Sequence, residues 1–357
     1  MKSDLKQYFF QMVRVDSESG EEKKFLQFIS QLFGQILEAK SQYDDFGNLI
    51  MKIKPKNSLN KESLLFCCHG DTVKPGKGID PIEKNGKIYS RGNTILGADD
   101  KAGIAEILVA IANADQYPPI ELVVTRQEEV GLTGSSHLDG HLVSAKQGYV
   151  LDSESLEDIV IGGPSRMKII VDIKGKAAHA VEPQNGISAI EIAAQSISVL
   201  QTGWIDQETT VNIGLIKGGQ VLNAVPEKAE IQIECRSQNH QKCLDHSQLI
   251  KHTFETVAKA RQAQAIVKMD LDLKASRISE KHEVVQIAQK AIQFYGLQPK
   301  TIVICGGTDA AYLNQKGIAT AVLGVGGKLP HSMDEHIFLK DMEKATKILI
   351  KILEYYS

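Results

Sequence analysis

The 357-residue chain is poor in several features that would define its class at once. It has only five cysteines, an odd number, and no two of them are spaced as C-x-x-C. This pattern argues against a disulfide framework and against a zinc site built from thiolates. The chain also has no apolar run close to the ~20 residues that span a bilayer, so we expect no membrane partner.

Neither sign of charge is in excess. The chain has 41 basic and 44 acidic residues, and its formal net charge is -3. This balance gives no electrostatic basis for binding nucleic acid. The first twenty residues carry scattered charges and no apolar segment followed by small residues, unlike a secretory signal. We therefore expect a cytoplasmic protein whose cysteines stay reduced.

The length and the apolar patterns predict two domains, since single cores seldom grow beyond ~250–300 residues. Apolar runs alternate with helical patterns in residues 1–163 and again in residues 275–357, which predicts an α/β domain with a mixed, mainly parallel sheet. Residues 164–274 follow the order strand, helix, strand, strand, helix, strand. That order is typical of a ferredoxin-like α+β unit, which would interrupt the α/β domain.

The segment "DSESGEE" precedes a helical pattern and has a structural interpretation. Ser19 and Glu22 have the S-x-x-E spacing of a capping box. In such a box the two side chains bond to backbone amides at the beginning of a helix. The segment is therefore predicted to begin a helix and needs no catalytic role.

Acidic and imidazole side chains follow the apolar runs of the predicted α/β domain. Open α/β sheets bind their ligands at the carboxyl ends of the strands, so these side chains should meet at one edge. Two histidines and six acids lie in such positions: His69 and Asp71 in "CCHGD", Asp99 and Asp100 in "GADDKAG", Glu128 and Glu129 in "RQEE", Asp152 in "VLDSE", and His331 in "LPHS".

This set of side chains has the chemistry of a metal site. Imidazole and carboxylate ligands suit divalent zinc, with manganese or cobalt as substitutes. So many acids favour two ions ~3.5–4 Å apart with a bridging carboxylate. Asp71 can orient the imidazole of His69. In the pair Glu128 and Glu129, one residue can bind metal while the other accepts a proton from water; the alternative is a charged turn in water.

Five ordered motifs resemble those of the M20 family of metallopeptidases, most closely its tripeptide aminopeptidase (peptidase T) branch. They are "CCHGDTV", "GADDKAG", "RQEEVG", "LDSE" and "PHSMDE", and the inserted domain adds "KGKAAHA" and "NAVPEKAEI". Each motif alone is common, but five in register over nearly the whole chain are specific. The resemblance implies a zinc-exopeptidase-type catalytic domain and a lid or dimerisation role for the inserted domain.

The resemblance also implies an activity, namely aminopeptidase hydrolysis of short peptides such as di- or tripeptides. A hydroxide bridging two zinc ions would attack the peptide carbonyl, with Glu128 as the general base and Asp71 orienting His69. The implied metal ligands are His69, Asp99, Glu129, Asp152 and His331, with Asp99 bridging.

Substrate-binding residues are implied in both domains. His179 would meet the carbonyl oxygen, often across a homodimer interface formed by the lid. The other implied residues are Asn223 and Arg236 in the lid, and Gly307 and Thr308 in "CGGTDAAYL".

One position departs from the peptidase T pattern. Peptidase T has an arginine just before "GGTD", where this chain has Cys305, so recognition of a tripeptide does not follow from the motif. An M20-type deacylase of N-acyl amino acids is therefore an alternative function. A non-catalytic metal-binding protein is a third.

Overall fold

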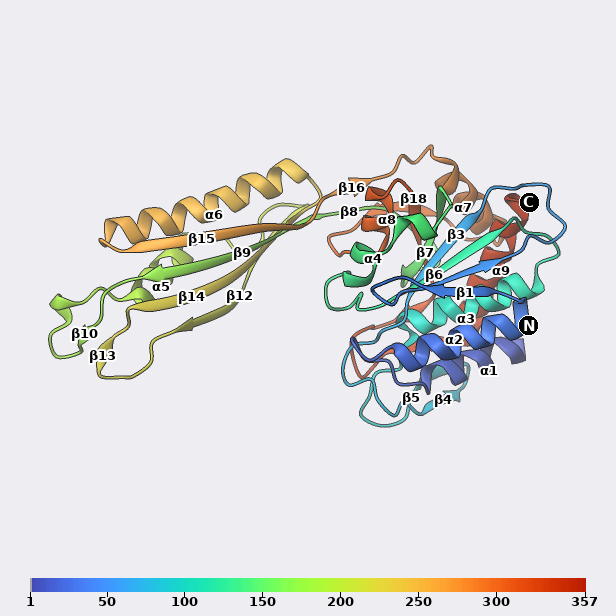
Figure 1. The fold of residues 1–357 in the computed structure, drawn as a ribbon, viewed down its shortest axis with the longest axis horizontal. Coiled ribbons are helices and arrows are strands. Elements are labelled where there is room, and N and C mark those ends of the chain that lie inside the picture. The colour runs from blue at the N-terminus through green and yellow to red at the C-terminus, as the bar shows by residue number, and fades with distance from the viewer. Residues whose placement is uncertain (1) are drawn as a thin grey trace. The chain divides into compact units, whose positions relative to one another are not determined.

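The computed structural model describes residues 2–357, which form two units (Figure 1). The first unit extends to Gly162 and resumes with Arg277–Val303 and Gly307–Ser357. The second consists of Gly163–Ser276 and Ile304–Gly306. Each unit has its own cluster of buried apolar side chains. No helix among the described residues is long and apolar enough to cross a membrane.

The first unit is built on a sheet whose central strands are parallel. These are, in spatial order, β6 (Ile120–Thr125), β3 (Leu64–His69), β7 (Gln147–Ser153) and β18 (Ala319–Gly324). All residues of β3 and β6 are buried, as expected for strands covered on both faces. The parallel arrangement brings the carboxyl ends of these strands to one edge.

Further strands extend this sheet on both sides. Antiparallel pairing joins β1 to β2, β2 to β6, and β8 to β18, so the sheet is mixed. The added strands are β1 (Lys40–Tyr43), β2 (Leu49–Ile53), β8 (Asp158–Gly163), β16 (Ser276–Arg277) and β17 (Lys300–Val303). The expected α/β class with a mainly parallel centre is confirmed.

Helices complete the first unit, and α3 (Ala98–Asn113) lies at the centre of their layer. It contacts β3 and β7 as well as the helices α1, α2 and α9, and nearly all its residues are buried, as expected for a helix covered on all sides. The surrounding helices are α1 (Lys2–Val13), α2 (Lys23–Leu37), α7 (Glu283–Phe294) and α9 (Leu339–Tyr355); the short α4 (Thr133–His137) and α8 (Ala310–Gln315) contact each other.

A small antiparallel sheet was not expected from the sequence. Its order is β19 (Gly327–Lys328), β20 (His336–Phe338), β5 (Lys87–Ser90) and β4 (Pro81–Lys84). The connection between β19 and β20 contains His331, which lies at a positive φ of 60°. This sheet therefore anchors the loop that carries the second predicted histidine ligand.

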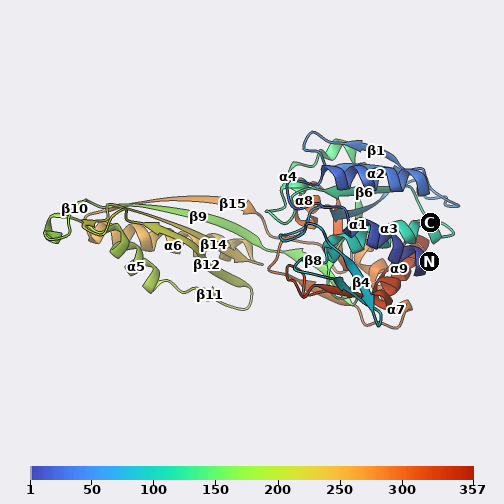
Figure 2. The ribbon, with the colours of Figure 1, turned by 90° about the horizontal axis from the view of Figure 1, so that it is seen from below.

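The second unit has the ferredoxin-like order predicted from the sequence. Its strands lie side by side as β12-β14-β9-β15, all antiparallel, and β9 alternates between buried and more exposed positions (Figures 1 and 2). The elements follow the chain as β9 (Ser165–Lys174), α5 (Ala189–Val199), β12 (Thr209–Gly218), β14 (Lys228–Ser237), α6 (His240–Ala260) and β15 (Gln264–Leu273). Short strands β10 (Ala178–His179) and β13 (Ala224–Val225) pair beyond them.

The predicted capping box is wrong. Helix α2 begins after Glu22 without a side-chain cap, and the hydroxyl of Ser19 instead donates to Asp71 Oδ2 at 2.7 Å. The fully buried Glu22 pairs with Arg126 at 2.9 Å and accepts from the Gln127 amide at 3.2 Å. Glu22 keeps one local bond, from the Gly20 amide at 2.7 Å, but the other partners of Ser19 and Glu22 are distant in the sequence, because buried polar groups need hydrogen bonds.

Tyr149 on β7 joins the parts of the first unit that come before and after the second unit. Its hydroxyl donates to the Val284 carbonyl at 2.7 Å, and the side chain is fully buried. We expect Tyr149→Phe to lower the free energy of unfolding by about 0.5–1.5 kcal/mol, because it removes a buried hydrogen bond between the two parts of the unit. Urea unfolding measures this, with Tyr355→Phe, at a 43% exposed residue, as the control that changes little. Equal stability of the two variants would contradict the role of the hydrogen bond.

Candidate metal centre

The residues predicted at the strand ends lie close together at the carboxyl edge of the sheet. His69 is the last residue of β3, and Asp152 is the second-last residue of β7. Glu129 follows β6, and Asp99 lies at the beginning of α3. Two groups of three ligand residues form there, and within each the ligand atoms lie within 4.8 Å of one another: His69, Asp99 and Asp152, and Asp99, Glu129 and His331. Asp99 is the member that the two groups share.

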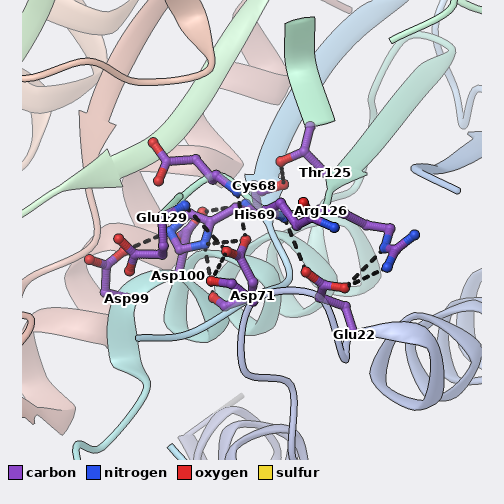
Figure 3. A network of polar contacts seen from close by, with 12 residues as sticks. Glu22, Cys68, His69, Asp71, Asp99, Asp100, Thr125, Arg126 and Glu129 are labelled. Atoms are coloured by element: carbon purple, nitrogen blue, oxygen red, sulfur yellow. Dashed lines mark hydrogen bonds and ion pairs between the residues drawn. The ribbon is translucent and has the colours of Figure 1, made fainter. Parts of the chain in front are cut away.

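The Asp99 carboxylate lies between two imidazoles. Its Oδ1 is 2.9 Å from His69 Nε2, and its Oδ2 is 3.3 Å from His331 Nε2. Glu129 Oε2 lies 2.9 Å from the same His331 nitrogen (Figure 3 shows Asp99, His69 and Glu129). Each oxygen of one carboxylate thus faces a different ligand group, which is the arrangement of a bridging ligand.

These contacts shift the protonation equilibria of the ligands. The hydrogen bonds that His331 donates to Asp99 and then to Glu129 raise its pKa to about 10. Burial disfavours the charged form of His69, but its contacts with Asp71 and Asp99 prevail and raise its pKa well above the usual value. Burial also opposes ionisation of Asp99, yet the two imidazoles hold its pKa below the usual range. These contacts therefore favour the cationic form of the two imidazoles and the anionic form of Asp99.

Asp71 is fully buried and fixes the loop that follows β6. Its Oδ1 accepts from the Glu128 amide at 2.9 Å, and its Oδ2 accepts from the Glu129 amide at 3.2 Å. His69 Nδ1 lies 3.0 Å from the Asp71 main-chain oxygen and 3.5 Å from Oδ1 (Figure 3). Asp71 therefore contacts the histidine mainly through its backbone, while its carboxylate sets the positions of both glutamates.

Glu128 differs from its neighbour Glu129 in its surroundings. It is in neither ligand group, and it is only 8% exposed. Burial first, and then the charge of Asp152, raise the pKa of Glu128 well above the usual value for a glutamate. A carboxylate with a raised pKa beside a metal site has the properties of a general base that works near neutral pH.

Two supporting acids were missed in the sequence. Glu335, 2% exposed, accepts from the amides of Leu96 and Gly97 at 2.7 Å and of Asp99 at 3.1 Å. Asp309, 1% exposed, accepts from the hydroxyl of Thr125 at the end of β6. Glu335 lies in the motif "PHSMDE" and Asp309 in "CGGTDAAYL". Their closeness in the sequence to predicted site residues is the feature that could have indicated them.

The predicted substrate residues of the second unit lie in two separate places. His179 is exposed on β10, and the Asn223 carbonyl accepts from the amide next to it, Ala180, at 3.0 Å. Arg236 lies near the other end of β14, where its guanidinium binds both oxygens of Glu234 at 2.6 and 3.0 Å and the Cys305 carbonyl at 3.3 Å. The sheet of this unit therefore separates Arg236 from the other two.

The remaining predicted residues precede α8 in the first unit. Thr308 is 8% exposed and directly precedes the buried Asp309. Gly307 begins the last segment of this unit, and the three residues before it belong to the second unit. Cys305 is among those three, and Gln238 Nε2 donates to its sulfur at 3.5 Å. The "CGGTD" segment is thus divided between the two units.

Comparison with known families is consistent with this geometry. The model of peptidase family M20/M25/M40 matches residues 65–355, which include all five predicted ligands. The chain belongs to this family. It is therefore an M20-type metallopeptidase, and the resemblance seen in the motifs is confirmed. This membership leaves the alternative of a non-catalytic metal-binding protein without support.

Relatives of this M20 peptidase match it over its whole length. The structure of aminopeptidase PepT from Bacillus cereus is 35% identical with a TM-score of 0.92, covering 100% of this chain and 99% of that one. A tripeptidase from Staphylococcus aureus is 32% identical with a TM-score of 0.94, covering 100% and 98%. The Bacillus subtilis protein YqjE is 34% identical, over 98% of this chain and 97% of its own.

The residues present fit a pair of divalent ions. The donor set combines two imidazoles with carboxylates and has no thiolate, which suits zinc, manganese or cobalt. Several carboxylates lie at this edge of the sheet. Burial first, and then the charge of Asp99, raise the pKa of Asp152. Bound cations would offset that repulsion, so the M20 peptidase has the electrostatics of a metal site.

Metal binding should displace protons from this site. The carboxylates raise the pKa values of His69 and His331 and so favour imidazolium in the metal-free site, whereas neutral imidazole is the form that binds metal. We expect Zn²⁺ binding at pH 7 to release protons from these rings and from Asp152, whose pKa is also raised, and the affinity to rise with pH toward the pKa of His331. Calorimetry in two buffers of different ionisation enthalpy measures the release.

The variant His331→Ala is the control for this measurement. It removes one protonated ring, so the number of protons released should fall by about one. Binding without proton release, or an affinity that does not change between pH 6 and pH 8, would contradict the proposed state of the two histidines.

Proposed function

We propose that this M20 peptidase is an aminopeptidase that hydrolyses short peptides at a centre of two divalent ions, zinc being the first candidate. The observation that carries the proposal is the position of Asp99, whose two oxygens each face one imidazole. The similarity to an aminopeptidase and a tripeptidase at 35% and 32% identity supports peptides as the substrate class.

Each side chain of the centre has a distinct task in this proposal. His69 and Asp152 would hold one ion, Glu129 and His331 would hold the other, and Asp99 would contribute to both. When bound, the two ions would lower the pKa of water and polarise the carbonyl of the scissile peptide bond. His69 is buried, Asp99, Asp152 and Glu129 are partly exposed and His331 is exposed, so the centre is accessible from the side of His331.

Proton transfer is assigned to Glu128. Its carboxylate accepts a proton from the attacking water, and its carboxylic acid then gives that proton to the leaving amine. Burial and the charge of Asp152 raise the pKa of Glu128, which makes its carboxylate a stronger proton acceptor than an exposed glutamate. Asp71 has a positioning role, because its carboxylate holds the backbone amides of Glu128 and Glu129.

The alternative substrate is an N-acyl amino acid. The same centre can polarise any amide carbonyl, and Cys305 in place of the peptidase T arginine is the observation that favours this alternative. Hydrolysis of a free-amino tripeptide and its N-acetyl form by the same protein preparation separates the two functions. Cleavage of only the free peptide supports the aminopeptidase, and cleavage of only the acetylated peptide supports the deacylase.

We also propose a homodimer formed through the second unit. The outer edge of β12 is unpaired beyond the short contact with β11 (Gly203–Trp204), and Leu215 and Ile216 on it are 51% and 53% exposed. An exposed apolar edge strand is a surface that favours pairing with another chain. A single monomer mass at every protein concentration in sedimentation experiments would contradict the dimer.

The separation of His179 from Arg236 favours a site shared between two chains. His179 lies on β10, whose partner strand β13 ends three residues before β14 begins at Lys228. Arg236 lies eight residues further along β14, which is ~26 Å at strand spacing. One short peptide cannot reach both side chains of the same chain. If both contact one short substrate, the two side chains must therefore come from different chains, and we propose that His179 is the residue of the partner subunit.

Removal of the Glu128 carboxylate should stop catalysis without loss of metal. We expect Glu128→Gln to lower kcat by about 10³-fold, because general base catalysis contributes ~10²–10⁴-fold. Glu129→Gln is the matched control, which should lose metal, because Glu129 belongs to a ligand group. Steady-state kinetics and metal content are measured for both. Near-normal turnover of Glu128→Gln with full metal content would rule out the proposed base.

Mixed dimers test whether His179 acts across the interface. Glu128→Ala and His179→Ala chains are each expected to be inactive, but in a mixed dimer one site would receive both intact residues. Co-expression should restore roughly a quarter of wild-type activity, since half the dimers are mixed and one of their two sites is complete. No recovery in isolated mixed dimers would show that His179 acts within its own chain or not at all.

A further inference from the structure

A cavity of about 490 Å³ adjoins the metal centre within the first unit. Asp99 and Asp152 contribute to its wall, so a group bound there lies next to the scissile carbonyl of a substrate. Volumes of this size are typical of pockets for small molecules or single residues. The rest of the wall includes Glu154, Asp158, Lys328 and Glu335.

Most charged groups on this wall are already engaged. Asp99 and Asp152 would bind the ions, and the carboxylate of Glu335 accepts three backbone amides. The Lys328 ammonium lies 3.5 Å from the main-chain oxygen of Glu154, so these two oppositely charged residues lie beside each other on the wall. Among residues 2–357, this leaves the carboxylates of Glu154 and Asp158 without a partner on the wall, and Asp158 is the less exposed of the two.

Asp158 is a half-buried acid at the first residue of β8. Its backbone is fixed, since its amide donates to the Ser155 carbonyl at 3.1 Å. Within residues 2–357, its carboxylate has no hydrogen bond or ion pair, whereas the adjacent Glu157 pairs with Lys300 at 3.9 Å and accepts from the Gln298 amide at 3.0 Å. A partly desolvated carboxylate without a partner gains free energy when a cation binds to it.

We propose that this cavity binds an ammonium group of the residue on the amino-terminal side of the scissile bond, with Asp158 as its anionic partner. The proposal rests on the proposed aminopeptidase function, in which that residue carries a free α-ammonium. A lysine side chain at the same residue supplies the same chemistry. In both cases Asp158 determines specificity and is not part of the proton-transfer machinery.

The test compares Asp158→Asn with Glu154→Gln, a matched variant that removes a different carboxylate from the same cavity. Hydrolysis of Lys-Ala-Ala and norleucine-Ala-Ala shows whether a side-chain ammonium is bound, because norleucine has the same chain length without the charge. Competitive inhibition by norleucinamide and by hexanamide shows whether the α-ammonium is bound, because hexanamide lacks it. Thermal unfolding of both variants verifies that they are folded.

Recognition of the α-ammonium predicts that Asp158→Asn weakens inhibition by norleucinamide about tenfold or more and leaves inhibition by hexanamide unchanged. Recognition of a side-chain ammonium predicts a similar loss in kcat/KM for Lys-Ala-Ala alone. Either result, with little effect of Glu154→Gln, supports the proposal.

Three results would overturn the assignment to Asp158: no change in Asp158→Asn, equal loss for the charged and uncharged members of each pair, or the same loss in Glu154→Gln. Failure of the underlying aminopeptidase function gives a different result, since the wild-type protein with two bound ions would then cleave neither tripeptide.

Discussion

The contact of Asp99 with two imidazoles is the interaction on which the rest of the centre depends. Several carboxylates meet at one edge of the sheet, where burial and mutual repulsion raise the pKa of Glu128 and Asp152. Asp99 is the exception, because His69 and His331 keep it ionised. Its charge is thus available to two cations at once, while the protonatable Glu128 remains beside them.

A second constraint is that buried acids must fix the irregular backbone around the ligands through hydrogen bonds from its amides. Glu129 lies in the loop after β6, and Asp99 lies at the beginning of α3 with a non-helical backbone, so neither ligand is held by a regular strand or helix. Asp71 fixes the first and Glu335 the second, each through backbone amides. Supporting acids of this kind orient the metal-binding residues without competing for the ions. The precision of the site therefore depends on residues that would touch neither metal nor substrate.

The parts of this architecture that depend on local pattern could be predicted from the sequence. Buried parallel strands are continuous apolar runs, so their ends, and the polar residues His69 and Asp152 that occupy them, are visible in the sequence. In the inserted α+β unit apolar and polar residues alternate cleanly along the strands, so the order of strands and helices along the chain could be predicted. The contacts of Ser19 with Asp71 and of Glu22 with Arg126 could not be predicted, because these partners lie 52 and 104 residues away. A local capping pattern does not show such tertiary contacts.

Metal stoichiometry tests the central claim most directly. Protein purified without chelator, or reconstituted with Zn²⁺, should contain two ions per chain, and Asp99→Ala should lose both, because each ligand group includes Asp99. Asp100→Ala, which changes the adjacent acid outside these groups, should retain more metal. A wild-type chain with no bound metal after reconstitution, or an Asp99→Ala chain that still holds two ions, would contradict the account.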